Sequence, residues 1–192
     1  ASLCSYDAPR QNPVEYAYSL SVLSNEAKAL DVVGAHPNVV KVLAICTDRP
    51  AIVMELASAN LEALILSKAR VHPAGLWAWA GQMASAIAHI HSMGCLHLDV
   101  KSGNILIFPD QTAKLADFGN AVMTPRSGPA SLRVRTVAEV VTLAYRPPEI
   151  IMGATHCTDK TDAWGLGAIV LEMLMGKAAF LGTVGGTCGC RV

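Results

Sequence analysis

Four polar residues have the types and the spacing that phosphoryl transfer requires. Asp99, Lys101 and Asn104 lie in the segment 95–106, Cys-Leu-His-Leu-Asp-Val-Lys-Ser-Gly-Asn-Ile-Leu, and Asp117 follows thirteen residues after Asn104 in Asp-Phe-Gly. A carboxylate can orient a hydroxyl nucleophile, an ammonium group can neutralise the transferring phosphate, and carboxylate and amide oxygens can hold Mg²⁺. Turn or helix-cap carboxylates are the alternative interpretation of Asp99 and Asp117. The order and spacing of the motifs favour phosphoryl-transfer chemistry.

The sequence pattern H-x-D-x-K-x-x-N followed by D-F-G resembles the catalytic and metal-binding loops of eukaryotic protein kinases. The resemblance covers roughly residues 14–181. It implies that the complete protein uses ATP and Mg²⁺ to phosphorylate Ser or Thr of a protein substrate, with room for a regulatory protein partner. By the same resemblance, Asp99 orients the substrate hydroxyl and Lys101 neutralises the moving phosphoryl group. Asn104 and Asp117 would hold the metal.

The resemblance also implies a nucleotide pocket on both sides of this loop. Met54-Glu55-Leu56-Ala57 falls where the hinge is expected, whose main chain pairs with adenine while apolar side chains enclose the ring. Asn60 is expected near the ribose and Leu106 on the adenine floor. Glu26, upstream of His36-Pro37-Asn38, fits the helix glutamate that pairs with a strand lysine, and a surface helix glutamate is the alternative.

Two later segments extend the resemblance. Residues 142–149, Thr-Leu-Ala-Tyr-Arg-Pro-Pro-Glu, look like the substrate-binding segment that ends in A-P-E, with Pro147 in place of Ala. Asp162, in D-A-W-G-L-G, is similar to the start of the central helix, where the carboxylate is expected to hold the catalytic loop by hydrogen bonds. Lys101 with Thr142 is the serine/threonine pattern, and the activation segment is closest to cyclin-dependent and MAP-type kinases.

The chain departs from the family pattern in three ways. Leu98 stands where the family carries an Arg that binds a phosphorylated residue of the activation loop. Leu cannot bind a phosphate, which argues against activation by phosphorylation of Thr136. No Gly-rich loop precedes the helix, and the first lysine is Lys28, so no lysine is available upstream of Glu26. Helices after the central one, and with them an arginine partner for Glu149, are not expected. We therefore predict little or no activity for this chain alone, and exposed apolar surface at its base.

The fold that the resemblance implies is α+β, with an incomplete small β lobe and a mainly helical large lobe that lacks its last helices. The expected division is a partial N-lobe at 1–56, a C-lobe at 57–181 and a disordered tail at 182–192. Apolar spacing and cap residues predict helices at 14–33, 61–69, 75–93 and 162–176. Asn60 is expected to cap the second, and the buried face of the third is expected to carry Trp79, Met83, Ile87 and Ile90. Alternation and turn signals predict strands at 39–46, 51–56, 105–108 and 113–115, the first two as a hairpin. Residues 1–13 and 120–146 are expected to be irregular.

Composition limits the class of protein. A chain of 192 residues suits one domain, and 52% hydrophobic residues supply an ample core. Fifteen basic residues balance fifteen acidic ones, which gives no indication of a nucleic-acid or membrane partner. The six cysteines, including Cys188 and Cys190, indicate reduced thiols rather than a metal site. No signal peptide or membrane span is recognised, so a cytoplasmic or nuclear location, or both, is expected.

Two other classes of function remain open. A pseudokinase-like module would dock a partner protein without moving phosphate. A G-x-G-x-x-G strand pair and a V-A-x-K strand upstream would favour the enzyme, and a start codon near Ala1 would favour the module. A small-molecule phosphotransferase could share an H-x-D-x-x-x-x-N loop. The D-F-G motif and the Pro147-Pro148-Glu149 segment, a platform for protein substrates, argue against that third class.

Overall fold

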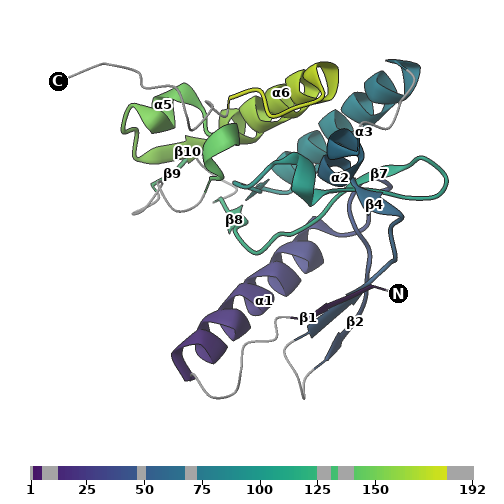
Figure 1. Cartoon of the computed structure of the whole chain (residues 1–192). Helices are drawn as coiled ribbons and strands as arrows, with labels where there is room; N and C mark the ends of the chain where they lie inside the picture. Colours follow the sequence, from purple (N-terminus) through teal and green to yellow (C-terminus); the bar gives the residue numbers. More distant parts are fainter. Residues whose placement is uncertain are drawn as a thin grey trace.

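The computed structural model describes residues 2–5, 13–46, 51–67, 73–124, 131–133 and 141–180. The tail predicted to be disordered, 182–192, lies outside these residues. A small sheet and one long helix form the lower part in Figure 1, and a mainly helical part lies above them. The α+β class and the two-lobe arrangement are as predicted.

The small sheet contains three antiparallel strands in the order β1-β3-β2. Strand β2 (Val42–Cys46) and strand β3 (Ala51–Met54) form the predicted hairpin, although β2 begins later than expected. Strand β1 (Ser2–Ser5) corrects the prediction that residues 1–13 are irregular. Its four residues carry no clear alternation, and the strand forms because its main chain pairs with β3, from Ser2 opposite Met54 to Ser5 opposite Ala51.

Helix α1 (Pro13–Val33) lies beside this sheet and matches the predicted helix. A proline suits the first helical position, where the missing N–H group has no intrahelical partner to lose. The helix ends where Gly34 adopts a φ of 69° and its N–H donates to Leu30 O at 3.0 Å. Glu26 and Leu30 are both buried, so α1 contributes to the core over its second half.

The predicted helices of the upper part are also present. Helix α2 (Leu61–Leu66) is capped by Asn60, whose Oδ1 accepts the N–H of Ala63 at 2.8 Å, as predicted. Helix α3 (Pro73–Ser92) is followed by Gly94 with a φ of 73°. The four α3 residues predicted to face the core are buried, namely Trp79, Met83, Ile87 and Ile90.

Helix α6 (Asp159–Met175) begins three residues before the predicted start at Asp162. The reason is a capping box in which Thr158 Oγ1 accepts the N–H of Lys160 at 3.2 Å and Thr161 Oγ1 accepts the N–H of Thr158 at 3.3 Å. The helix ends at Gly176, which has a φ of 67°. Helices α3 and α6 pack against each other across the upper part.

Short strands and turns connect these helices and hold the polar loops. The predicted strands β6 (Ile105–Ile107) and β7 (Ala113–Leu115) pair in a sheet of order β4-β6-β7, where β4 is Ala59–Asn60. Elements that the sequence did not predict are β5 (Cys95–Leu96) with β8 (Val122–Met123), β9 (Ser131–Arg133) with β10 (His156–Thr158), and α5 (Pro148–Ile151). Two 3₁₀ turns, η1 (Ser102–Asn104) and η2 (Leu143–Tyr145), complete the described part of the chain.

One apolar core joins both parts of the molecule, and a second, smaller cluster lies beside it. The main core includes Leu30 from α1, Met54 from β3, Ile90 from α3 and Ile169 from α6. The smaller cluster contains Leu96, Leu98, Ile150 and Cys157. Among the described residues, no helix has the length and hydrophobicity needed to span a membrane.

Candidate active site

The loop that carries Asp99 is held in place by a buried carboxylate. Asp162, near the start of α6, is 1% exposed. Its Oδ2 accepts the main-chain N–H of His97 at 2.9 Å, and its Oδ1 accepts that of Leu98 at 2.8 Å. His91 Nε2 of α3 lies 2.8 Å from the same Oδ2. The anchoring role predicted for Asp162 is therefore confirmed by its contacts.

Asp99 is buried and surrounded by donors. Lys101 Nζ donates to Asp99 Oδ2 at 2.6 Å, and Thr142 Oγ1 donates to Oδ1 at 2.7 Å. Asn104 Nδ2 donates to the Asp99 main-chain oxygen at 2.9 Å. Burial would raise the pKa of Asp99, but the hydrogen bonds from Lys101 and Thr142 and the charge of Lys101 outweigh it and lower that pKa. The carboxylate is consequently ionised at neutral pH.

Thr142 is a partner of Asp99 that the sequence did not reveal. The two residues are 43 positions apart, and Lys101 Nζ also lies 3.3 Å from Thr142 Oγ1. No short-range spacing could indicate this contact, because it depends on how the segment before η2 folds back over the catalytic loop. Lys101 and Thr142 were paired in the sequence only as a mark of the serine/threonine pattern.

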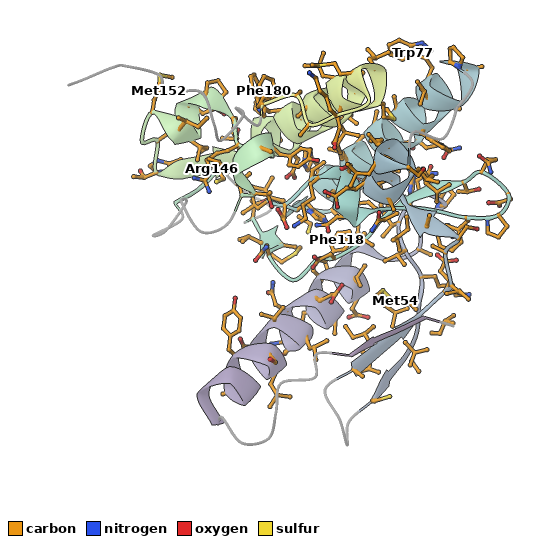
Figure 2. The ribbon with its side chains drawn as sticks, in the orientation of Figure 1. Met54, Trp77, Phe118, Arg146, Met152 and Phe180 are labelled. Atoms are coloured by element: carbon orange, nitrogen blue, oxygen red, sulfur yellow. The ribbon has the colours of Figure 1, made fainter. Side chains whose placement is uncertain are left out.

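The D-F-G segment lies between the catalytic loop and α1. Asp117 has a φ of 64°, in the left-handed region that few residues other than glycine adopt. Phe118 is fully buried and packs edge-on against His97, with ring centroids 4.8 Å apart. Figure 2 shows Phe118 where the upper part meets α1. This packing holds Asp117 at the edge of the catalytic loop.

Glu26 reaches the same place from α1. The residue is 2% exposed, and its Oε1 accepts the main-chain N–H of Phe118 at 3.3 Å. Burial and the negative charge of Asp117 raise the pKa of Glu26 from 4.5 to about 7, against the opposing effect of the Phe118 N–H. The interpretation of Glu26 as an ordinary surface glutamate is therefore wrong. Strand β1, which lies next to β3, carries Ser-Leu-Cys-Ser and contains no lysine.

A cavity of about 320 Å³ brings the predicted binding residues together. Its lining includes every residue assigned from the sequence to ATP or Mg²⁺: Glu26, Met54, Glu55, Leu56, Ala57, Asn60, Asn104, Leu106 and Asp117. Ala59, Gly103 and Ala116 also line it and were not predicted. The Glu55 carboxylate is engaged by Lys114 Nζ at 2.7 Å and by the Lys41 N–H at 2.9 Å.

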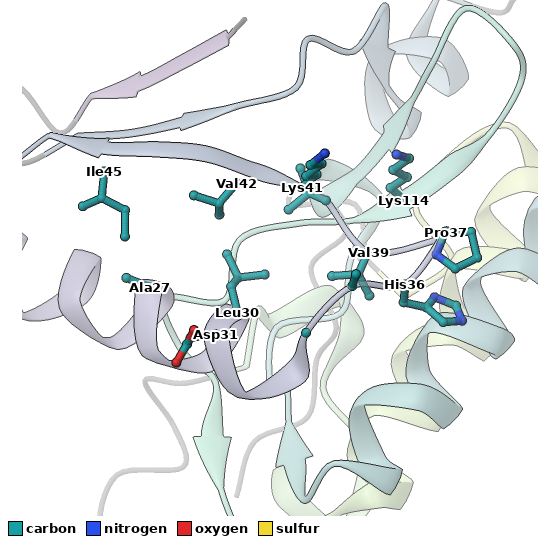
Figure 3. A pocket seen from close by; sticks show the side chains of 13 residues that line it. Ala27, Leu30, Asp31, His36, Pro37, Val39, Lys41, Val42, Ile45 and Lys114 are labelled. Atoms are coloured by element: carbon teal, nitrogen blue, oxygen red, sulfur yellow. The ribbon is translucent and has the colours of Figure 1, made fainter.

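A larger cavity, of about 600 Å³, lies on another side of α1 and contains none of the predicted site residues. It is bordered by Ala27 and Leu30 of α1, by Val42 and Ile45 of β2, and by Lys41 (Figure 3). The two residues of β2 are three positions apart and would face opposite sides of a regular strand. The register shift between Val42 and Ala44 supplies the extra residue that lets both line one cavity.

Comparison with known proteins identifies the family. A family model described as the protein kinase domain matches residues 10–187. The chain belongs to the protein kinase family. It is 36% identical over 143 residues to Serine/threonine-protein kinase KIN28 of Saccharomyces cerevisiae, covering 73% of this chain and 45% of that protein.

Other relatives point to the same type of kinase. The chain is 34% identical over 150 residues to the CTD kinase subunit alpha of Schizosaccharomyces pombe, covering 77% of this chain and 25% of that protein. It is 43% identical over 117 residues to Cyclin-dependent kinase 15 of Danio rerio, covering 58% of this chain and 27% of that protein. The predicted similarity to cyclin-dependent kinases is confirmed. The chain spans less than half the length of these relatives.

In this kinase domain, Leu98 does not leave a gap where the family carries Arg. Its side chain is fully buried, and it belongs to the small apolar cluster with Leu96, Ile150 and Cys157. Its φ of 62° lies in the left-handed region. The catalytic loop is therefore linked to α5 and β10 by apolar packing at this position. Thr136 lies outside the described residues.

The residues of the cavity fit Mg²⁺ and a nucleotide chemically. Asp117 offers a carboxylate. Asn104 offers its amide oxygen, because its Nδ2 is the atom that donates to Asp99. Hard oxygen donors of this kind suit Mg²⁺. Met54 and Leu106 supply apolar walls, and residues 55–57, whose main chain carries carbonyl acceptors and N–H donors, also line the cavity. Glu149 is exposed and forms no ion pair within the described part of the chain.

Proposed function

We propose that the complete protein transfers the γ-phosphate of ATP to Ser or Thr hydroxyls of protein substrates. The observation that carries this proposal is the Asp99 carboxylate, kept ionised and bonded to Lys101 at 2.6 Å beside the cavity lined by Asn104 and Asp117. A kinase needs an ionised carboxylate next to a cation and a metal site. The similarity to named serine/threonine kinases supports the same function.

In the proposed mechanism, each residue of the chain has a distinct task. The main chain of Glu55 to Ala57 binds the adenine edge, and Leu106 supports the ring. Asp99 accepts the hydrogen bond of the substrate hydroxyl and orients its oxygen towards the phosphate. Lys101 balances the negative charge that develops on the transferred group, while Asn104 and Asp117 hold Mg²⁺. When bound by these two residues, Mg²⁺ would neutralise charge on the phosphate oxygens.

Phosphotransfer by the full-length protein tests this mechanism. Asp99→Asn keeps the size of the side chain and removes its charge, so we expect a loss of ~10²–10⁴-fold in the rate of labelled phosphate transfer to a Ser/Thr substrate. Asp110→Asn, in an exposed turn, is the matched control and should leave the rate unchanged. Full activity in Asp99→Asn would contradict the proposal. For the 192-residue chain alone we expect a rate near background.

A pseudokinase-like binding module is the second candidate. The observation that favours it is Glu26, which is buried and takes part in no ion pair within the described part of the chain. A module needs the folded surface but no phosphate transfer. Suppose that Asp99→Asn abolishes phosphate transfer by the full-length protein while a gene that carries this substitution still supports the protein's role in the cell. That result would favour the binding module. Loss of that role together with transfer would favour the enzyme.

A further inference from the structure

A buried polar cluster next to the catalytic loop is used by none of the steps of the proposed mechanism. Ser102 of η1, Tyr145 of η2 and Glu172 of α6 are 0%, 8% and 4% exposed. Tyr145 Oη donates to Glu172 Oε2 at 2.6 Å, and Ser102 Oγ lies 2.8 Å from Tyr145 Oη. The cluster therefore joins the catalytic loop, the segment 142–149 and helix α6 through side chains alone.

The donors available decide the direction of these hydrogen bonds. Burial and the hydrogen bond to Glu172 raise the pKa of Tyr145, so the phenol keeps its proton. A phenol has one O–H group, and that of Tyr145 is used in the bond to Glu172. Ser102 Oγ–H is therefore the donor to Tyr145 Oη. Ser102 thus adds a second contact to a phenol that α6 already holds.

The catalytic loop and the segment 142–149 contact each other through side chains at two points. At one point Thr142 Oγ1 donates to Asp99 Oδ1 at 2.7 Å, and at the other Ser102 donates to Tyr145. The main chain fixes the spacing on the segment, because the Tyr145 N–H donates to Thr142 O at 2.9 Å in η2. Two contacts define the relative orientation of two segments, whereas a single contact leaves them free to rotate.

Helix α6 holds the catalytic loop without help from Ser102. Asp162 accepts two main-chain N–H groups of the loop, and Gly165 lies so close to it that a Cβ there would come within 2.7 Å of Val100 O. Removal of the Ser102 hydroxyl also leaves the Tyr145 O–H paired with Glu172, so no buried donor loses its acceptor. The loss should therefore change the place of the segment 142–149 rather than the fold.

We propose that Ser102 is a positioning residue for the protein substrate, because its bond to Tyr145 sets the place of the segment 142–149 relative to Asp99. This inference rests on the proposed phosphate transfer and adds a residue to it. Neither Ser102 nor Tyr145 lines the cavity that contains the predicted ATP residues. The hydroxyl of Ser102 therefore acts on the protein substrate and not on ATP.

Steady-state kinetics of the full-length protein, with myelin basic protein as the phosphate acceptor, test the proposal. Ser102→Ala should raise the KM for the acceptor about threefold to tenfold, the effect of one lost hydrogen bond, and leave the KM for ATP unchanged. A merely structural role would lower the amount of folded enzyme and hence the apparent kcat, with both KM values unchanged. Ser92→Ala is the matched control, since the exposed Ser92 Oγ donates to His89 O at 2.7 Å on α3.

A second variant tests whether Ser102 acts through Tyr145. Tyr145→Phe removes the acceptor of the Ser102 hydroxyl and should also raise the KM for the acceptor. Ser102→Ala added to Tyr145→Phe should then cause no further rise, because two residues that act through one contact are not additive. Circular dichroism on each variant checks the fold.

An unchanged KM for the acceptor in Ser102→Ala would overturn the proposal, as would a double variant whose KM rises by the product of the two single effects. These results leave phosphate transfer by the unchanged protein intact, so they remove this inference alone. A full-length protein that transfers no phosphate to Ser or Thr would overturn the proposed function, and this inference with it.

Discussion

At the scale of single residues, the surroundings of two buried carboxylates in this kinase domain shift their pKa values in opposite directions. Asp99 receives hydrogen bonds from Lys101 and Thr142, and its pKa is lowered. Glu26 receives one long hydrogen bond from the Phe118 N–H and faces the charge of Asp117, and its pKa is raised to about 7. Burial alone would raise the pKa of both groups. The surrounding donors therefore decide which carboxylate is charged at neutral pH.

This difference predicts how stability depends on pH in metal-free solution. Folded Glu26 keeps its proton up to about pH 7, whereas the unfolded group releases it near 4.5. Between these values the folded state binds more protons, so stability falls as pH rises. Relative to Glu26→Gln, the free energy of unfolding should decrease by ~3 kcal/mol from pH 4.5 to pH 8.

Urea denaturation in EDTA across that pH range measures the difference between the two chains. The Glu26→Gln variant serves as the reference, because the unchanged chain and the variant have all other titrating groups in common. A difference that stays constant with pH, or that grows in favour of the unchanged chain as pH rises, would show that Glu26 is not held protonated.

At the scale of elements, the catalytic loop depends on the helices behind it. Asp162 of α6 accepts two main-chain N–H groups of the loop, and His91 of α3 contacts the same carboxylate. On the other side, Asn104 and the 3₁₀ turn η1 connect the loop to β6. The loop has little regular structure of its own, so these contacts fix its geometry.

Removal of the Asp162 side chain should therefore destabilise the domain strongly. Asp162→Ala leaves the buried N–H groups of His97 and Leu98 without acceptors, at ~3–5 kcal/mol in total. Asp159→Ala, in the first turn of the same helix, removes an exposed carboxylate that pairs with Lys160 at 3.1 Å and should cost less than about 1 kcal/mol. Urea denaturation followed by circular dichroism compares the two variants.

If Asp162→Ala does not fold, Asp162→Asn provides the comparison, since one acceptor oxygen remains and the loss should be smaller. A stability of Asp162→Ala equal to that of Asp159→Ala would show that the loop does not depend on this anchor.

The sequence predicted the elements whose signals are local. The Asn60 cap, the buried face of α3 and the hairpin β2–β3 follow from short-range chemistry. Strand β1 was missed because its pairing with β3 comes from chain segments far apart in sequence. For the candidate site, resemblance located the cavity-lining residues, but the contact of Thr142 with Asp99 needed the folded chain, because the two residues are 43 positions apart.

At the scale of the whole molecule, large apolar side chains remain exposed on the upper part. Trp77 of α3 is 60% exposed, Leu174 of α6 is 58% exposed, and Met152, which follows α5, is 79% exposed. Figure 2 shows Trp77, Met152 and Phe180 along the edge away from α1. The expectation of exposed apolar surface in the large lobe is confirmed for these residues. Surfaces of this kind favour association.

We expect the purified chain to self-associate with increasing concentration. Trp77 and Leu174 border the same shallow depression between α3 and α6, so Trp77→Lys combined with Leu174→Lys should shift the chain towards monomer. Leu66→Lys, at the equally exposed end of α2, is the control and should leave association unchanged. Sedimentation velocity at several concentrations measures the distribution. A chain that stays monomeric at all concentrations would contradict the expectation.

The central claim is that the cavity between the two parts binds ATP with a divalent cation, and a thermal-shift titration tests it most directly. A ligand at 100 times its Kd adds ~2.7 kcal/mol to the stability of the folded state. We predict a shift with ATP that increases when Mg²⁺ is added, and a Mg²⁺-dependent part that Asp117→Ala removes while Asp110→Ala retains it. A folded chain that shows no shift with ATP, with or without Mg²⁺, would contradict the account.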